Sequence, residues 1–147
     1  MPSPVIRALA ARAGLPFVDA HTIDTFLAPA AGEPAHAVLF FTGDPSQRAE
    51  TNDVAVVLPE LLAAFTGRLR AAIITRGAEA ALQARFHVVV MPSLAVTRAE
   101  TPVGVLPRVR DWSDYIRTIE RCLAPDAPAL IAGEKPEVRI TRTGAPA

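Results

Sequence analysis

Two short apolar runs constrain the fold of this chain more than any other feature. Ala35–Phe41 reads AHAVLFF and Leu69–Thr75 reads LRAAIIT. Runs of this length, bounded by polar segments and containing β-branched or aromatic residues, predict strands that are buried on both faces. Such strands lie inside a sheet that helices cover on both sides, so we expect an α/β protein.

The segments around these runs supply the helices and the remaining strands. Val54–Phe65 (VAVVLPELLAAF) is apolar almost all round, which predicts a buried helix with a kink at Pro59. Ser93–Arg98 alternates and predicts a hairpin with Val103–Leu106. The last helix is expected after a cap at Asp111, with an apolar stripe of Trp112, Ile116, Ile119 and Leu123. Further helices are expected at Pro4–Ala13, after Thr22 and at Ala78–Phe86, with a short strand at Phe17-Val18.

This element order predicts a central mixed β-sheet flanked by helices on both faces. We expect three parts: an N-terminal helical segment over residues 1–16, a folded domain over 17–123, and a tail over 124–147. The tail is rich in Pro, Ala and Gly and is expected to be mobile, although Glu137–Arg142 (EVRITR) alternates and could order on a partner.

Composition excludes several classes of protein. No apolar stretch approaches the roughly 20 residues of a membrane span, and the N-terminus is expected to be a helix rather than a secretion signal, so we expect a cytoplasmic protein. A net charge of zero argues against nucleic-acid binding. The lone Cys122 excludes an internal disulfide, and the three histidines are scattered, so no metal site is expected.

The charges are unevenly distributed along the chain. Ala13–Gly67 holds seven acidic residues and one basic residue, whereas the chain from Arg68 onward holds eight acidic and twelve basic residues. The simplest interpretation is that these are solvated surfaces of a soluble protein.

The element order resembles that of thioredoxins. Pro59 in the apolar helix resembles the kink of the thioredoxin active-site helix, and Met91-Pro92 before the hairpin is similar to the family's cis-proline step. Counting back from Pro59 places the family's Cys-x-x-Cys on Thr51-Asn52-Asp53-Val54, so Thr51 and Val54 stand at the two redox positions. Dithiol exchange needs two thiols, so redox chemistry is not expected at this site.

A narrower resemblance is to hydrogenase-expression proteins of the HyaE/HupG type, which have a thioredoxin-like fold without the dithiol. It is carried by Ala84–Val88 (ARFHV), Met91–Leu94 (MPSL), the Thr51–Asp53 segment and Arg110–Trp112. The resemblance implies an assembly chaperone for uptake [NiFe] hydrogenase, without a cofactor or catalytic residues. It also implies a partner, the small-subunit precursor with its twin-arginine signal peptide, and beyond it other hydrogenase maturation proteins.

Two surfaces are candidates for partner binding. If the Met91–Pro92 bond is cis, backbone groups beside it are expected to stay unpaired and to hold an extended peptide by strand addition. The second surface is acidic, because carboxylates bind guanidinium groups through paired hydrogen bonds. Its candidate residues are Asp44, Glu50, Asp53 and Glu60.

Two other functions remain open from the sequence. Cys122 could serve a one-cysteine redox enzyme, or the chain could be an inactive relative of one. Alternatively, the chain could be a structural subunit of a larger maturation complex. The sequence contains no Gly-rich phosphate loop and no evident Ser-His-acid set, so nothing in it favours an enzyme.

Overall fold

The computed structural model of the chain describes residues 3–44 and 49–131. Their strands form one sheet in the order β1-β3-β2-β4-β5. The sheet is mixed, since β3 is parallel to β1 and β2, whereas β4 is antiparallel to β2 and β5. The strands are β1 (Phe17–Val18), β2 (His36–Phe41), β3 (Arg70–Ile74), β4 (Ser93–Arg98) and β5 (Thr101–Pro107).

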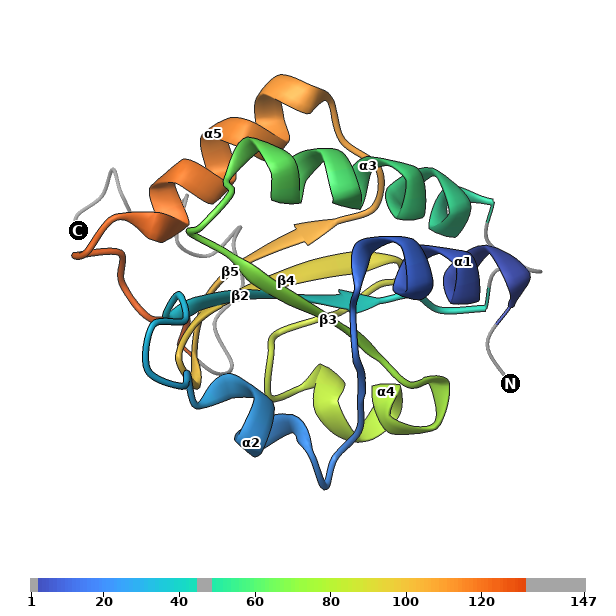
Figure 1. Cartoon of the computed structure of the whole chain (residues 1–147), viewed down its shortest axis with the longest axis horizontal. Coiled ribbons are helices and arrows are strands. Elements are labelled where there is room, and N and C mark those ends of the chain that lie inside the picture. Colours follow the sequence, from blue (N-terminus) through green and yellow to red (C-terminus); the bar gives the residue numbers. More distant parts are fainter. Residues whose placement is uncertain (1–2, 45–48, 132–147) are drawn as a thin grey trace, which may run out of the picture.

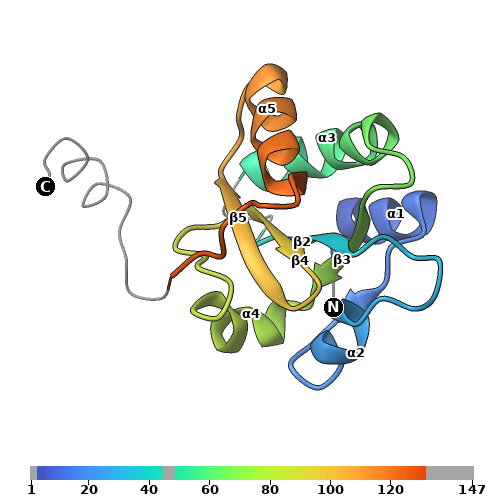
Figure 2. The same cartoon turned by 90° about the vertical axis from the view of Figure 1, so that its left-hand side faces the viewer.

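Helices cover both faces of this sheet (Figures 1 and 2). On one face lie α1 (Pro4–Ala13), α3 (Glu50–Ala64) and α5 (Trp112–Leu123), and on the other lie α2 (Ile23–Leu27) and α4 (Arg76–Gln83). Each face has its own buried apolar cluster, and β2 contributes to both: Phe40 belongs to the first and Phe41 to the second, each fully buried. The predicted α/β architecture with two covered faces is confirmed.

The helix α3 begins earlier than predicted. It starts at Glu50 rather than Val54, so Glu50, Thr51 and Asp53 belong to its first turn and not to a loop. Carboxylates near a helix N-terminus interact favourably with the backbone dipole there, which offsets the turn preference of Asn and Asp. Pro59 lies inside the helix, as predicted.

The predicted apolar stripe of α5 is displaced. Trp112 is 48% exposed, whereas Tyr115 is fully buried in the first cluster together with Ile119. Asp111 occupies the N-cap position without a side-chain hydrogen bond. The predicted N-cap position is therefore confirmed, and Ile119 and Leu123 are buried as predicted, whereas the prediction for Trp112 is wrong because the buried stripe includes Tyr115 and Cys122 instead.

The chain continues beyond α5 along the edge strand β5. Ala127 is buried, its carbonyl accepts a hydrogen bond from Arg98, and the Leu130 amide donates to the Pro102 carbonyl at 2.9 Å. Residues 132–147, which include the predicted Glu137–Arg142 segment, lie outside the described residues. Among the described residues, no helix is long and apolar enough to cross a membrane.

Candidate functional site

The peptide bond between Met91 and Pro92 is cis, in agreement with the predicted proline step. Pro92 is buried, and its carbonyl accepts a hydrogen bond from the Arg108 amide at 2.8 Å. Met91 is half-buried and packs against the second apolar cluster. Its own N–H and C=O form no hydrogen bond with any residue that the structure describes. Two backbone groups beside the proline are thus free to bind another chain.

Arg108 connects the elements around this proline. Its amide contacts Pro92, its guanidinium binds the Glu50 carboxylate at the start of α3 with distances of 2.9 and 2.7 Å, and its carbonyl accepts from the Tyr115 hydroxyl at 3.4 Å. Arg108 adopts a left-handed backbone conformation, with φ of 64°. Sequence analysis missed this residue, because no local pattern indicates a partner 58 positions away.

Glu50 is held by this arginine and by a backbone amide. The Val109 N–H donates to the same carboxylate at 3.3 Å. The hydrogen bond from Arg108, supported by the one from Val109, lowers the pKa of Glu50 from 4.5 to about 2. Glu50, which was predicted to bind a partner, is therefore ionised at neutral pH and forms an ion pair with Arg108 of the same chain.

The two former redox positions are closed to solvent. Thr51 and Val54 both have no exposed surface. The Thr51 hydroxyl donates to the Thr42 carbonyl at 2.6 Å, which ties the start of α3 to the end of β2, and Val54 packs in the first apolar cluster. These positions contribute packing and a structural hydrogen bond.

A buried carboxylate supports the segment between β2 and α3. Glu79 on α4 is only 5% exposed, and it accepts hydrogen bonds from the Gly43 amide at 3.0 Å and the Thr42 hydroxyl at 3.3 Å. Arg76 lies beside both Glu79, at 3.4 Å, and Asp44, at 3.8 Å. Sequence analysis missed Glu79, although its spacing from Leu82 and Phe86 places it on the buried stripe of its helix.

The two oppositely charged halves of the chain pair with each other. Four ion pairs join an acidic residue of the first half to an arginine of the second: Asp24–Arg85, Glu33–Arg70, Asp44–Arg76 and Glu50–Arg108. By contrast, Asp53 and Glu60 are exposed on α3 and have no ion-pair partner among the described residues. Glu60 lies about 10 Å farther along the helix axis than Asp53. The structure thus connects Glu50 to Pro92 through Arg108 and leaves Glu60 away from that contact.

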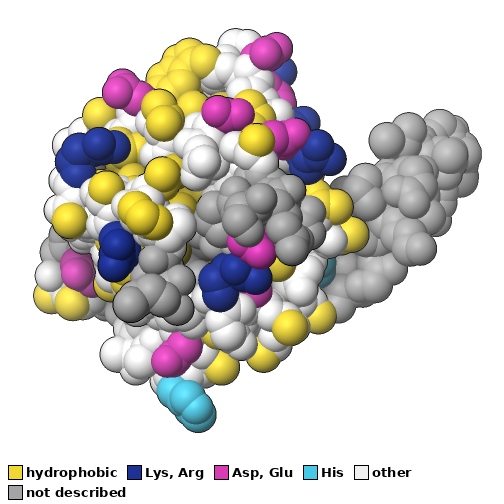
Figure 3. All heavy atoms as spheres, turned by 90° about the vertical axis from the view of Figure 1, so that its right-hand side faces the viewer, with side chains coloured by type: hydrophobic (Ala, Val, Ile, Leu, Met, Phe, Trp, Pro, Cys, Tyr) yellow, Lys and Arg dark blue, Asp and Glu magenta, His cyan; other side chains and the backbone are white. Residues whose placement is uncertain are grey.

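Apolar side chains are exposed next to the proline. Val89 and Val90 precede Met91 and are 84% and 39% exposed, and Val109 and Trp112 follow Arg108 with 40% and 48% exposed. We call these four residues the proline rim. Figure 3 shows this end of the molecule, where apolar side chains lie among acidic and basic ones. Exposed apolar groups that gather on one surface are typical of protein-binding sites.

Cys122 lies elsewhere, between α5 and the edge strand β5. It is 5% exposed, and its thiol donates to the Val103 carbonyl with a sulfur–oxygen distance of 3.6 Å. Burial raises the pKa of the thiol. A pocket of about 640 Å³ next to it is lined by β5, α5 and residues 124–131. A buried thiol with a raised pKa lacks the thiolate character that redox catalysis requires.

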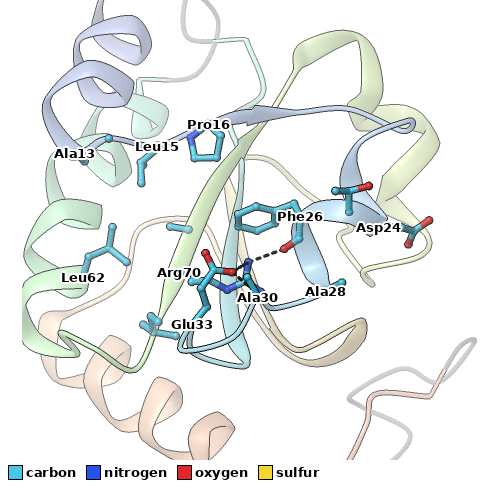
Figure 4. Close-up of a pocket in the computed structure, with 14 residues that line it drawn as sticks. Ala13, Leu15, Pro16, Asp24, Phe26, Ala28, Ala30, Glu33, Leu62 and Arg70 are labelled. Atoms are coloured by element: carbon cyan, nitrogen blue, oxygen red, sulfur yellow. Dashed lines mark hydrogen bonds and ion pairs between the residues drawn. The ribbon is translucent and has the colours of Figure 1, made fainter.

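A larger pocket of about 1060 Å³ opens at the opposite end of the sheet (Figure 4). At its base, the Arg70 guanidinium donates to the carbonyls of Pro34, Phe26 and Leu27 and stacks on the Phe26 ring at 4.7 Å. These contacts fasten the segment before β2 onto β3. We therefore interpret Arg70 as a structural residue. No group of three or more metal-ligating side chains occurs within residues 3–44 and 49–131.

Fold and site together define a thioredoxin-like protein whose two redox positions hold buried residues without thiols. The fold is shared with thioredoxin f2 of Chlamydomonas reinhardtii, with a TM-score of 0.58 at 17% identity over 76% of this chain and 98% of that one. The chain belongs to the family described as hydrogenase-1 expression protein HyaE, whose family model matches residues 5–115.

Relatives within this family cover almost the whole chain. The hydrogenase expression/formation protein HupG of Rhizobium leguminosarum bv. viciae is 60% identical over 144 residues, which is 98% of this chain and 97% of that protein. A crystal structure assigned to hydrogenase expression/formation protein hupG from Rhodopseudomonas palustris CGA009 is 47% identical, covers 77% of this chain and 99% of its own, and has a TM-score of 0.53. These relationships support a role in hydrogenase maturation.

Proposed function

We propose that the chain is a non-enzymatic assembly chaperone for uptake [NiFe] hydrogenase. It acts in the cytoplasm, where it binds the small-subunit precursor, including its twin-arginine signal peptide, until maturation is complete. One observation carries the proposal: unpaired backbone groups of Met91 and the exposed proline rim lie beside Pro92, at a site that holds no thiol.

Two further features support binding rather than catalysis. Thr51 and Val54 serve packing at the former redox positions, and Cys122 is buried away from them. The names of the relatives refer to hydrogenase expression and formation, which fits a role before the enzyme is complete.

Co-purification from cells that express the hydrogenase operon tests the proposal. A tagged chain is expected to retain the small-subunit precursor, and other maturation proteins with it, whereas mature small subunit without its signal peptide binds more weakly. Equal capture of the two forms would reject the signal-peptide part, and no capture of either would reject the proposal. Sedimentation distinguishes a transient chaperone from a permanent subunit, which would stay in a stable larger complex.

Alkylation tests the one-cysteine redox function. Iodoacetamide is expected to label Cys122 slowly in the native protein and rapidly in urea, because the thiol is buried and its pKa is raised. Rapid labelling of the native protein would favour the redox function instead.

A further inference from the structure

We propose that two copies of this chain form a symmetric dimer through the outward faces of α1 and α3. The proposal does not rest on the proposed function, because it concerns how the chain contacts a second copy of itself. Three observations lead to it: the opposite charges of the two helices, the lack of partners for those charges among the described residues, and an exposed valine on each helix.

The outward faces of the two helices carry opposite charges. α1 has no acidic residue, and its two basic residues, Arg7 and Arg12, are both exposed. α3 has no basic residue, and its exposed face carries Asp53 and Glu60. None of these four side chains forms an ion pair with any residue that the structure describes. Each helix therefore presents the charge that complements the other helix in a second copy.

Exposed apolar side chains accompany these charges. Val5 on α1 is 41% exposed, and Val56 on α3 is 66% exposed. Val56 lies between the two acidic residues of its helix, because residues three and four positions apart are neighbours on a helix surface. Ala8 and Ala11 are exposed on α1, where their small side chains let another helix approach closely. A partner that covers these faces gains apolar burial as well as ion pairs.

The arrangement of the two helices makes this surface self-complementary. α1 and α3 contact each other on one face of the sheet and run in the same direction (Figures 1 and 2). The direction follows from the topology, since the helices lead into β1 and β3, which are parallel neighbours. A two-fold axis that lies between the helices and parallel to them places α1 of each copy on α3 of the other. Both charged faces of both copies are then covered, so the assembly closes at two chains.

The spacing and size of the faces fit a reversible contact. Arg7 and Arg12 lie about 8 Å apart along their helix axis, and the two acidic residues of α3 lie about 10 Å apart, a difference that an arginine side chain can span. The helices are 10 and 15 residues long, so they bury less than the about 800 Å² per partner of a stable dimer. We therefore expect a Kd in the micromolar range. In the dimer, Asp53 and Glu60, which sequence analysis predicted to bind a partner, are paired with arginines of the second copy.

Sedimentation equilibrium of the full chain tests the inference. We expect a monomer–dimer equilibrium that weakens as the salt concentration rises from about 0.05 M to about 0.5 M. Arg7→Glu with Arg12→Glu makes both helix faces acidic, and it should raise the dimer Kd more than about tenfold. Asp53→Lys with Glu60→Lys makes both faces basic and should have the same effect. An equimolar mixture of these two double variants should form dimers again, because every contact then joins opposite charges.

Two further variants provide matched controls. Arg68→Glu with Arg121→Glu changes the net charge as much as the acidic double variant does, but both residues are exposed outside α1 and α3. It is expected to change Kd less than about threefold. Val56→Ser should raise Kd about tenfold, because the residue is buried twice in a two-fold contact. Ile131→Ser changes an apolar residue of nearly equal exposure, 64%, and should leave Kd unchanged.

The mixture of the two double variants gives the decisive outcome. Dimers in the mixture, and not in either variant alone, support the contact and also show that both variants are folded. A wild-type chain that stays monomeric at millimolar concentration would overturn the inference, and so would double variants that dimerise as tightly as the wild-type chain. Association that continues beyond two copies would overturn the two-fold arrangement. None of these outcomes bears on whether the chain binds the hydrogenase precursor.

Discussion

Arg108 and Glu50, 58 positions apart in the chain, form a two-point ion pair with nitrogen–oxygen distances of 2.9 and 2.7 Å. The pair fastens the turn after β5 to the first residue of α3, while the Arg108 amide binds the carbonyl of Pro92. The carboxylate that sequence analysis predicted to bind a partner is thus paired within the chain itself.

Breaking this ion pair is expected to loosen the turn after β5 without unfolding the protein. The Val109 N–H donates to the Glu50 carboxylate, which Arg108 holds in place. Arg108→Gln releases that carboxylate and Glu50→Gln removes its charge, so the Val109 amide hydrogen is expected to exchange faster in both variants. Hydrogen–deuterium exchange measures this change, and urea unfolding is expected to show nearly the same midpoint as the wild-type chain. Arg85→Gln breaks the distant Asp24–Arg85 pair and serves as the control, because it leaves Val109 exchange unchanged.

The same contact is expected to respond to acid in a defined range. The pKa of Glu50 is lowered to about 2, so the contact is complete above its ordinary value of 4.5 and is lost as the pH falls through about 2. The Val109 amide chemical shift, followed by NMR, reports this titration. Glu50→Gln removes it, and a midpoint near 4.5 in the wild-type chain would contradict the paired geometry.

A second pH effect is expected from His36. Burial, and after it the charges of Arg98 and Arg68, lower the pKa of His36 below 6.5, so the unfolded chain binds more protons than the folded one just below that pH. The free energy of unfolding should therefore fall as the pH drops from about 7.5 to about 5.5. Urea titrations of the wild-type chain and His36→Gln test this, with the variant showing the weaker dependence.

Thr51 is expected to matter for stability through its hydroxyl. Thr51→Val leaves the buried Thr42 carbonyl without this donor and should cost about 1–3 kcal/mol of unfolding free energy. Thr51→Ser keeps the hydroxyl and loses only a methyl group, so it should cost less than about 1 kcal/mol. Equal losses in the two variants, measured by urea unfolding, would show that packing and not the hydrogen bond is responsible.

Gly104 and Cys122 are expected to be energetically coupled. A methyl group added at Gly104 would overlap the Cys122 sulfur, so Gly104→Ala should destabilise the chain by about 1–3 kcal/mol. Cys122→Ala removes the obstructing atom, and the double variant should therefore be more stable than the sum of the two single losses by about 1 kcal/mol. Additive losses would mean that the strand moves away from α5 instead.

Patterns in neighbouring residues made the fold predictable. The buried run at Ala35–Phe41, the position of Pro59 and the Met91-Pro92 step each indicated their structure locally, because burial and backbone preference act over a few residues. The start of α3 was less predictable, since the preference of acidic residues for a helix N-terminus competes with the turn preference of Asn and Asp.

The details of the site depend on contacts that no local pattern encodes. Periodicity placed Trp112 on the buried side of the last helix and left Tyr115 out of the stripe, whereas packing in the structure buries Tyr115 and exposes Trp112. Likewise, the uneven charge distribution was visible in the sequence, but which arginine pairs with Glu50 or Asp24 depends on the topology of the sheet. Long-range pairing therefore had to come from the structure.

The ion pairs between the two halves have a consequence for synthesis. The acidic half leaves the ribosome first, with seven acids and one base from Ala13 to Gly67, and Arg108 follows Glu50 only 58 residues later. A fragment that ends at Gly67 carries an excess of negative charge, with seven acidic residues against Arg7, Arg12 and Arg48, and its central strand β2 has neither neighbour, because β3 and β4 both come afterwards. We therefore expect a ribosome-bound fragment ending near Gly67 to stay open to proteases, and resistance to appear only once translation has passed the turn that carries Arg108.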